Sequence, residues 1–108
     1  TFAPYFTEYR SYVSHYKGVL KVVPLKEDSF SLNVEEAERM IRMKTKAVIL
    51  NNPNNPSGVI YSAEELTALS EMLVRAEERV GHPIYLICDE PYLELAYDGI
   101  EVPYMPNL

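Results

Sequence analysis

Two short apolar runs, each followed at once by polar residues, constrain the fold of this chain most. Residues 47–50 lead into the polar loop 51–58, and residues 84–88 lead into the polar motif 89–92. Four apolar residues in a row without alternation indicate a strand that is covered on both faces, as in parallel sheets. Open α/β sheets bind their ligands in loops at the carboxyl ends of such strands. We therefore expect both polar segments to lie at a binding site.

Helical periodicity predicts three helices that alternate with the strands. Apolar residues recur at helical spacing over 7–17, from Asn33 onward, and after Ser62 as far as Val80. The first helix presents Tyr9, Tyr12, Val13 and Tyr16, the second Val34, Ala37, Met40 and Ile41, and the third Leu66, Leu69, Leu73, Ala76 and Val80. Their expected ends are Thr7 and Gly18 for the first helix, Asn33 with Glu36 for the start of the second, and Ser62 with Glu65 and then Gly81 for the third.

A third strand is expected over 19–25, which is rich in valine. The order is then helix, strand, helix, strand, helix, strand. This alternation predicts an α/β fold with a mostly parallel sheet flanked by helices, in a three-layer α/β/α arrangement.

Composition narrows the classes of function. The 108 residues carry a net charge of −6, and the basic residues are scattered, so the sequence predicts neither nucleic-acid nor membrane binding. The only cysteine, Cys88, lies in an apolar run, and a reduced cytoplasmic setting is expected. His15 and His82 lack companions at ligand spacing, so no metal site is predicted. Both ends of the chain look cut, which favours a fragment of a longer protein.

The two polar segments resemble the cofactor loops of a known enzyme family. Residues 47–58 are similar to the N-P-x-N-P-[ST]-G loop of the class I/II aminotransferases, and residues 89–92 to their D-E-x-Y motif. Residues 97–99 resemble the turn that follows, and residues 4–9 the segment with the aromatic residue that stacks on the cofactor. These are pyridoxal-phosphate (PLP) enzymes of fold type I. The resemblance implies that residues 1–108 are a fragment of the PLP-binding large domain.

The resemblance also implies residue roles. Asn55 and Tyr92 would bind the phenolic oxygen of PLP, Asp89 would pair with the pyridine nitrogen, and Phe6 would stack on the ring. Other interpretations stay open for single residues: Asp89 can cap the turn that follows it, Tyr92 can be one tyrosine among nine, and Asn55 can belong to a plain loop. Many aspartate-type members have tryptophan where Phe6 stands, and phenylalanine cannot donate a hydrogen bond.

Parts that the family needs are expected outside this chain. The resemblance places the Schiff-base lysine downstream of residue 108, the arginine for the substrate carboxylate in the small domain, and the phosphate-binding loop before residue 1. The lysines that precede the Asp89 strand are expected at the surface: Lys17, Lys21, Lys26, Lys44 and Lys46. We therefore expect no catalytic residue in this chain, and no activity from it alone.

The parent protein is expected to transfer an amino group between an amino acid, with aspartate as one candidate, and a 2-oxo acid. Two alternatives remain. One is a PLP-dependent lyase of the same fold, such as a carbon–sulfur lyase, and the other is an aminotransferase-like ligand-sensing domain of a transcription regulator. The same loops serve all three, because the cofactor carries the chemistry and the pocket selects the bond that breaks. The intact enzyme is expected to be a homodimer.

Overall fold

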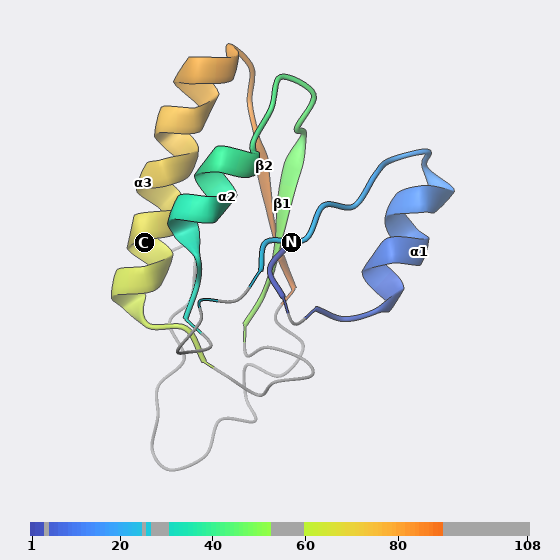
Figure 1. Ribbon diagram of the computed structural model, residues 1–108, viewed down its shortest axis with the longest axis horizontal. Coiled ribbons are helices and arrows are strands. Elements are labelled where there is room, and N and C mark those ends of the chain that lie inside the picture. The colour runs from blue at the N-terminus through green and yellow to red at the C-terminus, as the bar shows by residue number, and fades with distance from the viewer. Residues whose placement is uncertain (4, 25, 27–30, 53–59, 90–108) are drawn as a thin grey trace.

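The computed structural model describes residues 1–3, 5–24, 26, 31–52 and 60–89. Its elements, in chain order, are α1 (Glu8–His15), α2 (Val34–Met40), β1 (Ala47–Asn51), α3 (Ala63–Val80) and β2 (Tyr85–Asp89). The two strands pair in parallel, in a register that runs from Ala47 opposite Tyr85 to Asn51 opposite Asp89. Figure 1 shows α2 and α3 together on one side of the sheet and α1 on the other. The α/β class and the parallel pairing are confirmed.

The core lies between the sheet and the pair α2 and α3. Val48 and Leu50 point from β1 into it, and the apolar face of α3 meets them with its buried residues Leu66, Leu69, Met72, Leu73, Ala76 and Val80. Each large aliphatic side chain buried in this way contributes about 1.5–3 kcal/mol. The predicted inner faces of α2 and α3 are confirmed, since Ala37 and Ile41 are also buried.

Helix α3 begins and ends as its sequence predicts. The Ser62 hydroxyl accepts a hydrogen bond from the Glu65 N–H at 3.2 Å, and the Glu65 carboxylate accepts one from the Ser62 N–H at 2.8 Å. Gly81 ends the helix in the left-handed conformation with φ 78°. The other Glu65 oxygen accepts from the Leu32 N–H at 2.9 Å. Burial alone would raise the pKa of Glu65, but these backbone hydrogen bonds lower it on balance.

Helix α2 begins with half of the predicted capping box. The Asn33 side chain accepts from the Glu36 N–H at 3.3 Å, as expected. The Glu36 carboxylate, however, forms an ion pair with Arg39 at 3.1 Å. The pairing is possible because residues i and i+3 are neighbours on a helix surface.

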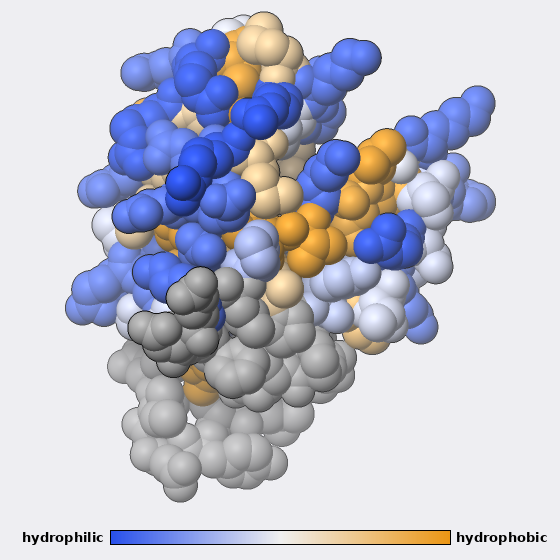
Figure 2. Space-filling view, viewed as in Figure 1, coloured by the Kyte–Doolittle hydropathy of each residue, from blue (hydrophilic) through white to orange (hydrophobic). Residues whose placement is uncertain are grey.

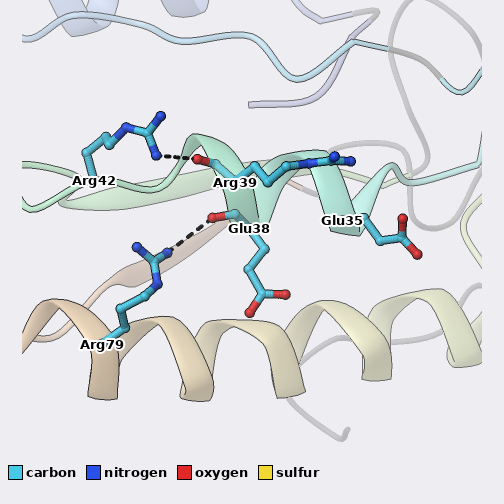
Figure 3. A pocket seen from close by; sticks show the side chains of 5 residues that line it. All are labelled: Glu35, Glu38, Arg39, Arg42 and Arg79. Atoms are coloured by element: carbon cyan, nitrogen blue, oxygen red, sulfur yellow. Dashed lines mark hydrogen bonds between the residues drawn. The ribbon is translucent and has the colours of Figure 1, made fainter.

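Arginines cap the other end of α2. Arg79, from α3, donates to the carbonyl oxygen of Ile41 at 3.3 Å. It also donates to that of Glu38 at 3.1 Å, and Arg42 donates to that of Arg39 (Figure 3). Carbonyl groups in the last turn of a helix have no partner within the helix, so these guanidinium groups stabilise it. These side chains line an open pocket on the surface, and the contacts with the end of α2 account for the positions of Arg42 and Arg79 in it.

The expected strand over 19–25 is wrong. Only Val23 pairs within the described residues, through a single parallel bridge to Phe2. Its N–H donates to the Thr1 carbonyl and its carbonyl accepts from the Ala3 N–H, each at 2.8 Å.

Helix α1 is shorter than the predicted 7–17 at both ends. Thr7 precedes it but makes no side-chain cap. At the other end Lys17, not Gly18, takes the left-handed conformation, with φ 61°. The N–H of Gly18 reaches the Val13 carbonyl and that of Lys17 reaches Ser14, the pattern of a Schellman motif. Glycine is required at 18 for space, because a Cβ there would lie 2.8 Å from Val13 Cγ1.

The apolar stripe of α1 and the second face of the sheet are more exposed than predicted. Tyr9 is buried, but Tyr12 is 56% and Tyr16 86% exposed. On the sheet, Ile49 is half-buried and Ile87 is 51% exposed, so the described residues cover this face only in part. A hollow of about 650 Å³ lies beside this face, and Figure 2 shows apolar surface between α2 and α1; lining residues include Val13, Val19, Leu20, Ile49 and Ile87.

In the described part of the chain, no helix has the length and apolar character needed to cross a membrane.

Candidate functional site

The carboxyl ends of β1 and β2 meet at one edge, where polar groups gather. Asn51 lies opposite Asp89 in the register. The Asn51 side chain donates through Nδ2 to the Asp89 carbonyl at 2.9 Å, and the Asn52 N–H reaches the same oxygen at 3.3 Å. Two donors on one carbonyl fix the backbone at the end of β2, and with it the base of the Asp89 side chain.

The Asp89 carboxylate is partly buried and is held by a tyrosine. The Tyr9 hydroxyl donates to Asp89 Oδ2 at 2.6 Å across 80 residues of sequence. This length is typical of a strong hydrogen bond between a hydroxyl and a charged carboxylate. Burial raises the pKa of Tyr9, and the hydrogen bond and negative charge of Asp89 raise it further. The hydroxyl therefore stays protonated and remains a donor.

Phe6 joins this pair from the segment before α1. Its half-buried ring lies edge-to-face against the ring of Tyr9, with centroids 5.7 Å apart and an interplanar angle of 87°. Edge-to-face geometry is favourable for two aromatic rings. The structure thus links two of the predicted site residues, Phe6 and Asp89, through Tyr9. The other two, Asn55 and Tyr92, lie outside the described residues.

Asn52 is the most buried polar side chain at this edge, with 1% of its surface exposed. Its Oδ1 accepts a hydrogen bond from the Tyr61 N–H at 3.0 Å. Its Nδ2 is buried as well and has no hydrogen-bond partner in the described structure. Asn52 therefore connects the end of β1 with Tyr61, which precedes α3. Its buried Nδ2 donates no hydrogen bond in the described structure.

Sequence reasoning missed the roles of Tyr9, Asn51 and Asn52. Tyr9 was expected only as part of an apolar stripe, and the two asparagines only as part of a motif. One signal was available for Tyr9: it stands three residues after Phe6 at a helix start, a spacing that places both on one side. Nothing in the sequence shows that its hydroxyl faces residue 89.

The chemistry that this edge supports follows from charge. No lysine, arginine or histidine of the described residues forms an ion pair with Asp89. A partly buried carboxylate is favoured by a positive or hydrogen-bonding partner. Tyr9 donates to one carboxylate oxygen, and no cation of the described residues pairs with the carboxylate. The described residues gather no cluster of histidine, cysteine or carboxylate side chains that could hold a metal ion.

These features define a class: an α/β domain whose polar groups gather at the carboxyl ends of parallel strands, the place where open α/β sheets bind ligands. The family model described as "Aminotransferase class I and II" matches residues 1–106, and the chain belongs to that family.

Individual relatives agree. The chain is 42% identical over 98 residues to a "Probable aspartate/prephenate aminotransferase" of Thermus aquaticus, covering 90% of this chain and 24% of the relative. It is 38% identical to an "Aspartate aminotransferase" of Geobacillus stearothermophilus, covering 89% and 23%. The chain thus spans about a quarter of the length of these relatives.

Solved structures show the same fold. An aminotransferase from Eubacterium rectale superimposes with a TM-score of 0.94 at 42% identity, covering 98% of this chain and 27% of that one. The aspartate aminotransferase of Thermus thermophilus with maleate gives 0.81 at 34% identity, covering 94% and 25%. The partial α/β domain described above is therefore a portion of the aminotransferase fold.

Proposed function

We propose that this chain is part of the PLP-binding large domain of a full-length aminotransferase, which transfers an amino group between an amino acid and a 2-oxo acid. The observation that carries the proposal is the Asp89 carboxylate, oriented by Tyr9 and without a cation among the described residues. A protonated pyridine nitrogen is a cation that fits it. When bound, PLP supplies the electron sink that amino-group transfer needs.

The residues of this chain would bind and orient the cofactor. Asp89 would hold the ring nitrogen in its protonated form, while Tyr9 fixes the direction of the carboxylate. Phe6, held against Tyr9, would cover a face of the ring. For Asn55 and Tyr92 the family resemblance alone supports contact with the phenolic oxygen. The lysine that binds PLP covalently would come from the sequence beyond residue 108, so the isolated chain should not transaminate.

The relatives' names support aspartate as an amino-acid substrate, since they include aspartate and aspartate/prephenate aminotransferases. Phe6 can stack on a ring but cannot donate a hydrogen bond to a substrate. A cytoplasmic setting and a homodimer are part of the same proposal. The first rests on the single cysteine in an apolar run, and the second rests on the family resemblance.

The test is an absorbance titration of the full-length protein with PLP, followed by aspartate and then 2-oxoglutarate. We expect a band of bound PLP that changes with aspartate and returns with 2-oxoglutarate. Asp89→Asn keeps the size of the side chain and an acceptor for Tyr9 but removes the charge. It should lower kcat by about 100-fold or more, as expected when a preorganised charge is lost.

Glu38→Gln is the control, because Glu38 is a carboxylate that pairs with Arg75 on the surface between α2 and α3. It should leave kcat unchanged. A wild-type band that never changes with either substrate would contradict the aminotransferase proposal. An Asp89→Asn variant with wild-type kcat would contradict the role of the carboxylate.

A further inference from the structure

We propose that Asn51 is a positioning residue for Asp89: its side-chain amide holds the main chain of Asp89 and so sets the direction in which the carboxylate meets the ring nitrogen of PLP. This inference rests on the proposed function. Its basis is the hydrogen bond from Asn51 Nδ2 to the Asp89 carbonyl oxygen at 2.9 Å, which joins residues 38 apart in sequence. The two residues lie opposite each other at the carboxyl ends of β1 and β2.

The Asn51 amide gives the Asp89 carbonyl a second donor. The same oxygen already accepts the Asn52 N–H at 3.3 Å, so it has a hydrogen-bond partner without the Asn51 side chain. A carbonyl oxygen has two lone pairs, and Asn51 uses the second at the shorter distance of 2.9 Å. Asn51 is only 4% exposed, so its amide is withdrawn from water for this contact. A second anchor on a carbonyl that already has a partner indicates a role in placing residue 89.

Asp89 is thereby held at both its main chain and its side chain. The Tyr9 hydroxyl, on α1, donates to Oδ2 at 2.6 Å, and the Asn51 amide, on β1, donates to the carbonyl oxygen. The main-chain contact fixes where the side chain begins, and the Tyr9 contact fixes where one of its oxygens lies. Groups that bind a cofactor have to be held within about 0.5 Å of the productive geometry. Loss of the Asn51 contact should therefore weaken the pairing with the ring nitrogen even when Tyr9 is in place.

The experiment compares PLP with its deaza analogue, in which a C–H replaces the ring nitrogen. The analogue cannot pair with Asp89 through that position, so a change that acts through Asp89 weakens the binding of PLP and spares the analogue. Dissociation constants for both compounds and the melting temperature are measured for the full-length protein and three variants. Asn51→Leu keeps the branching of the side chain without a donor, and the side chain in Asn51→Ser is too short to reach the carbonyl.

Asn33→Leu is the matched control. The Asn33 amide donates to the Pro24 carbonyl at 3.4 Å, so this variant removes the same kind of contact beside α2. The Asn33 oxygen also caps that helix by accepting the Glu36 N–H. The control should therefore lower the melting temperature and leave the preference for PLP over the analogue unchanged.

We expect the wild type to bind PLP more tightly than the analogue. Each Asn51 variant should lower this preference about tenfold and change the dissociation constant of the analogue by less than about twofold. An unchanged preference, equal losses for the two compounds, or an equal change in Asn33→Leu would overturn the inference. Failure of both Asn51 variants to fold would also overturn it, because Asn51 would then serve the stability of the sheet.

The proposed function fails in a different way. The wild-type protein would then show no PLP band, or none that responds to aspartate and 2-oxoglutarate. A responsive wild type whose Asn51 variants keep the full preference for PLP would overturn only the role of Asn51.

Discussion

The contact between Tyr9 and Asp89 can be tested by removing one oxygen atom. Tyr9→Phe keeps the ring that packs against Phe6 and deletes only the hydroxyl that donates to Asp89 Oδ2 at 2.6 Å. If this hydrogen bond orients the carboxylate, the variant should bind PLP more weakly and should be less stable. The two effects have one cause, because the carboxylate loses its donor in the apoprotein and its fixed direction in the complex.

The size of the effect follows from the geometry. Hydrogen bonds to a charged group contribute about 1.5–3 kcal/mol. Asp89 is only partly buried, so water can replace part of the lost bond, and the lower end of this range applies. We expect Tyr9→Phe to lower the free energy of unfolding by about 1.5 kcal/mol and to raise the PLP dissociation constant about tenfold. Chemical denaturation and an absorbance titration of the full-length protein measure the two quantities.

Helix α1 also provides the control. The Tyr12 hydroxyl donates to the Glu8 carboxylate at 2.7 Å, so the donor and acceptor chemistry is the same, but Tyr12 is exposed. Tyr12→Phe should leave both the free energy of unfolding and PLP binding essentially unchanged, because solvent screens this exposed contact. Equal losses of PLP affinity in the Tyr9 and Tyr12 variants would refute the assignment, because the effect would then belong to α1 and not to Asp89.

Three further predictions concern pH and backbone. The pKa of Tyr9 is raised above 10.0, so the contribution of its hydroxyl to the stability of the fold is complete below pH 10 and is lost as the pH rises beyond it. Between pH 9 and 11 the free energy of unfolding should therefore fall more steeply for the wild type than for Tyr9→Phe, by up to about 1.4 kcal/mol per pH unit. The pKa of Glu65 is lowered, so the contribution of its carboxylate to stability is present above pH 4.5 and is lost as the pH falls below that value. Chemical denaturation should show that Glu65→Gln lowers the free energy of unfolding by about 1–2 kcal/mol at pH 7 and by less at pH 3. Lys17→Gly removes a side chain from a left-handed backbone conformation and should raise the free energy of unfolding by about 0.5–1 kcal/mol. Gly18→Ala should lower it by about 1–3 kcal/mol, because the new Cβ would meet Val13. Thermal melts of the two variants measure both effects.

Local signals were sufficient for the half of the fold that contains α3. The pair Ser62 and Glu65, the apolar residues at helical spacing and Gly81 are all within one segment, and each acts over a few residues. The parallel strands were also predictable, because their apolar runs are short and a helix separates them. Signals of the same kind failed over 19–25. A strand needs a neighbour along its whole length, and among the described residues of this segment only Val23 has one, at Phe2.

The candidate site was predictable only where a motif names the residue. Asp89 follows an apolar run and could be expected to need a partner, but which partner it has depends on a contact across 80 residues. Tyr9 and Tyr12 cannot be told apart from the sequence, because both belong to the same helical stripe. In the structure both lie on α1 and both donate to a carboxylate. What separates them is burial beside the end of β2, and that is a property of the folded chain. The same holds for Asn52. Its side-chain oxygen accepts a hydrogen bond and its side-chain nitrogen has no partner in the described structure, a difference that the residue type alone does not reveal. Residues that act through another residue therefore have to be identified from the structure. Tyr9→Phe tests this for Asp89, with Tyr12→Phe as the control that has the same chemistry at an exposed position.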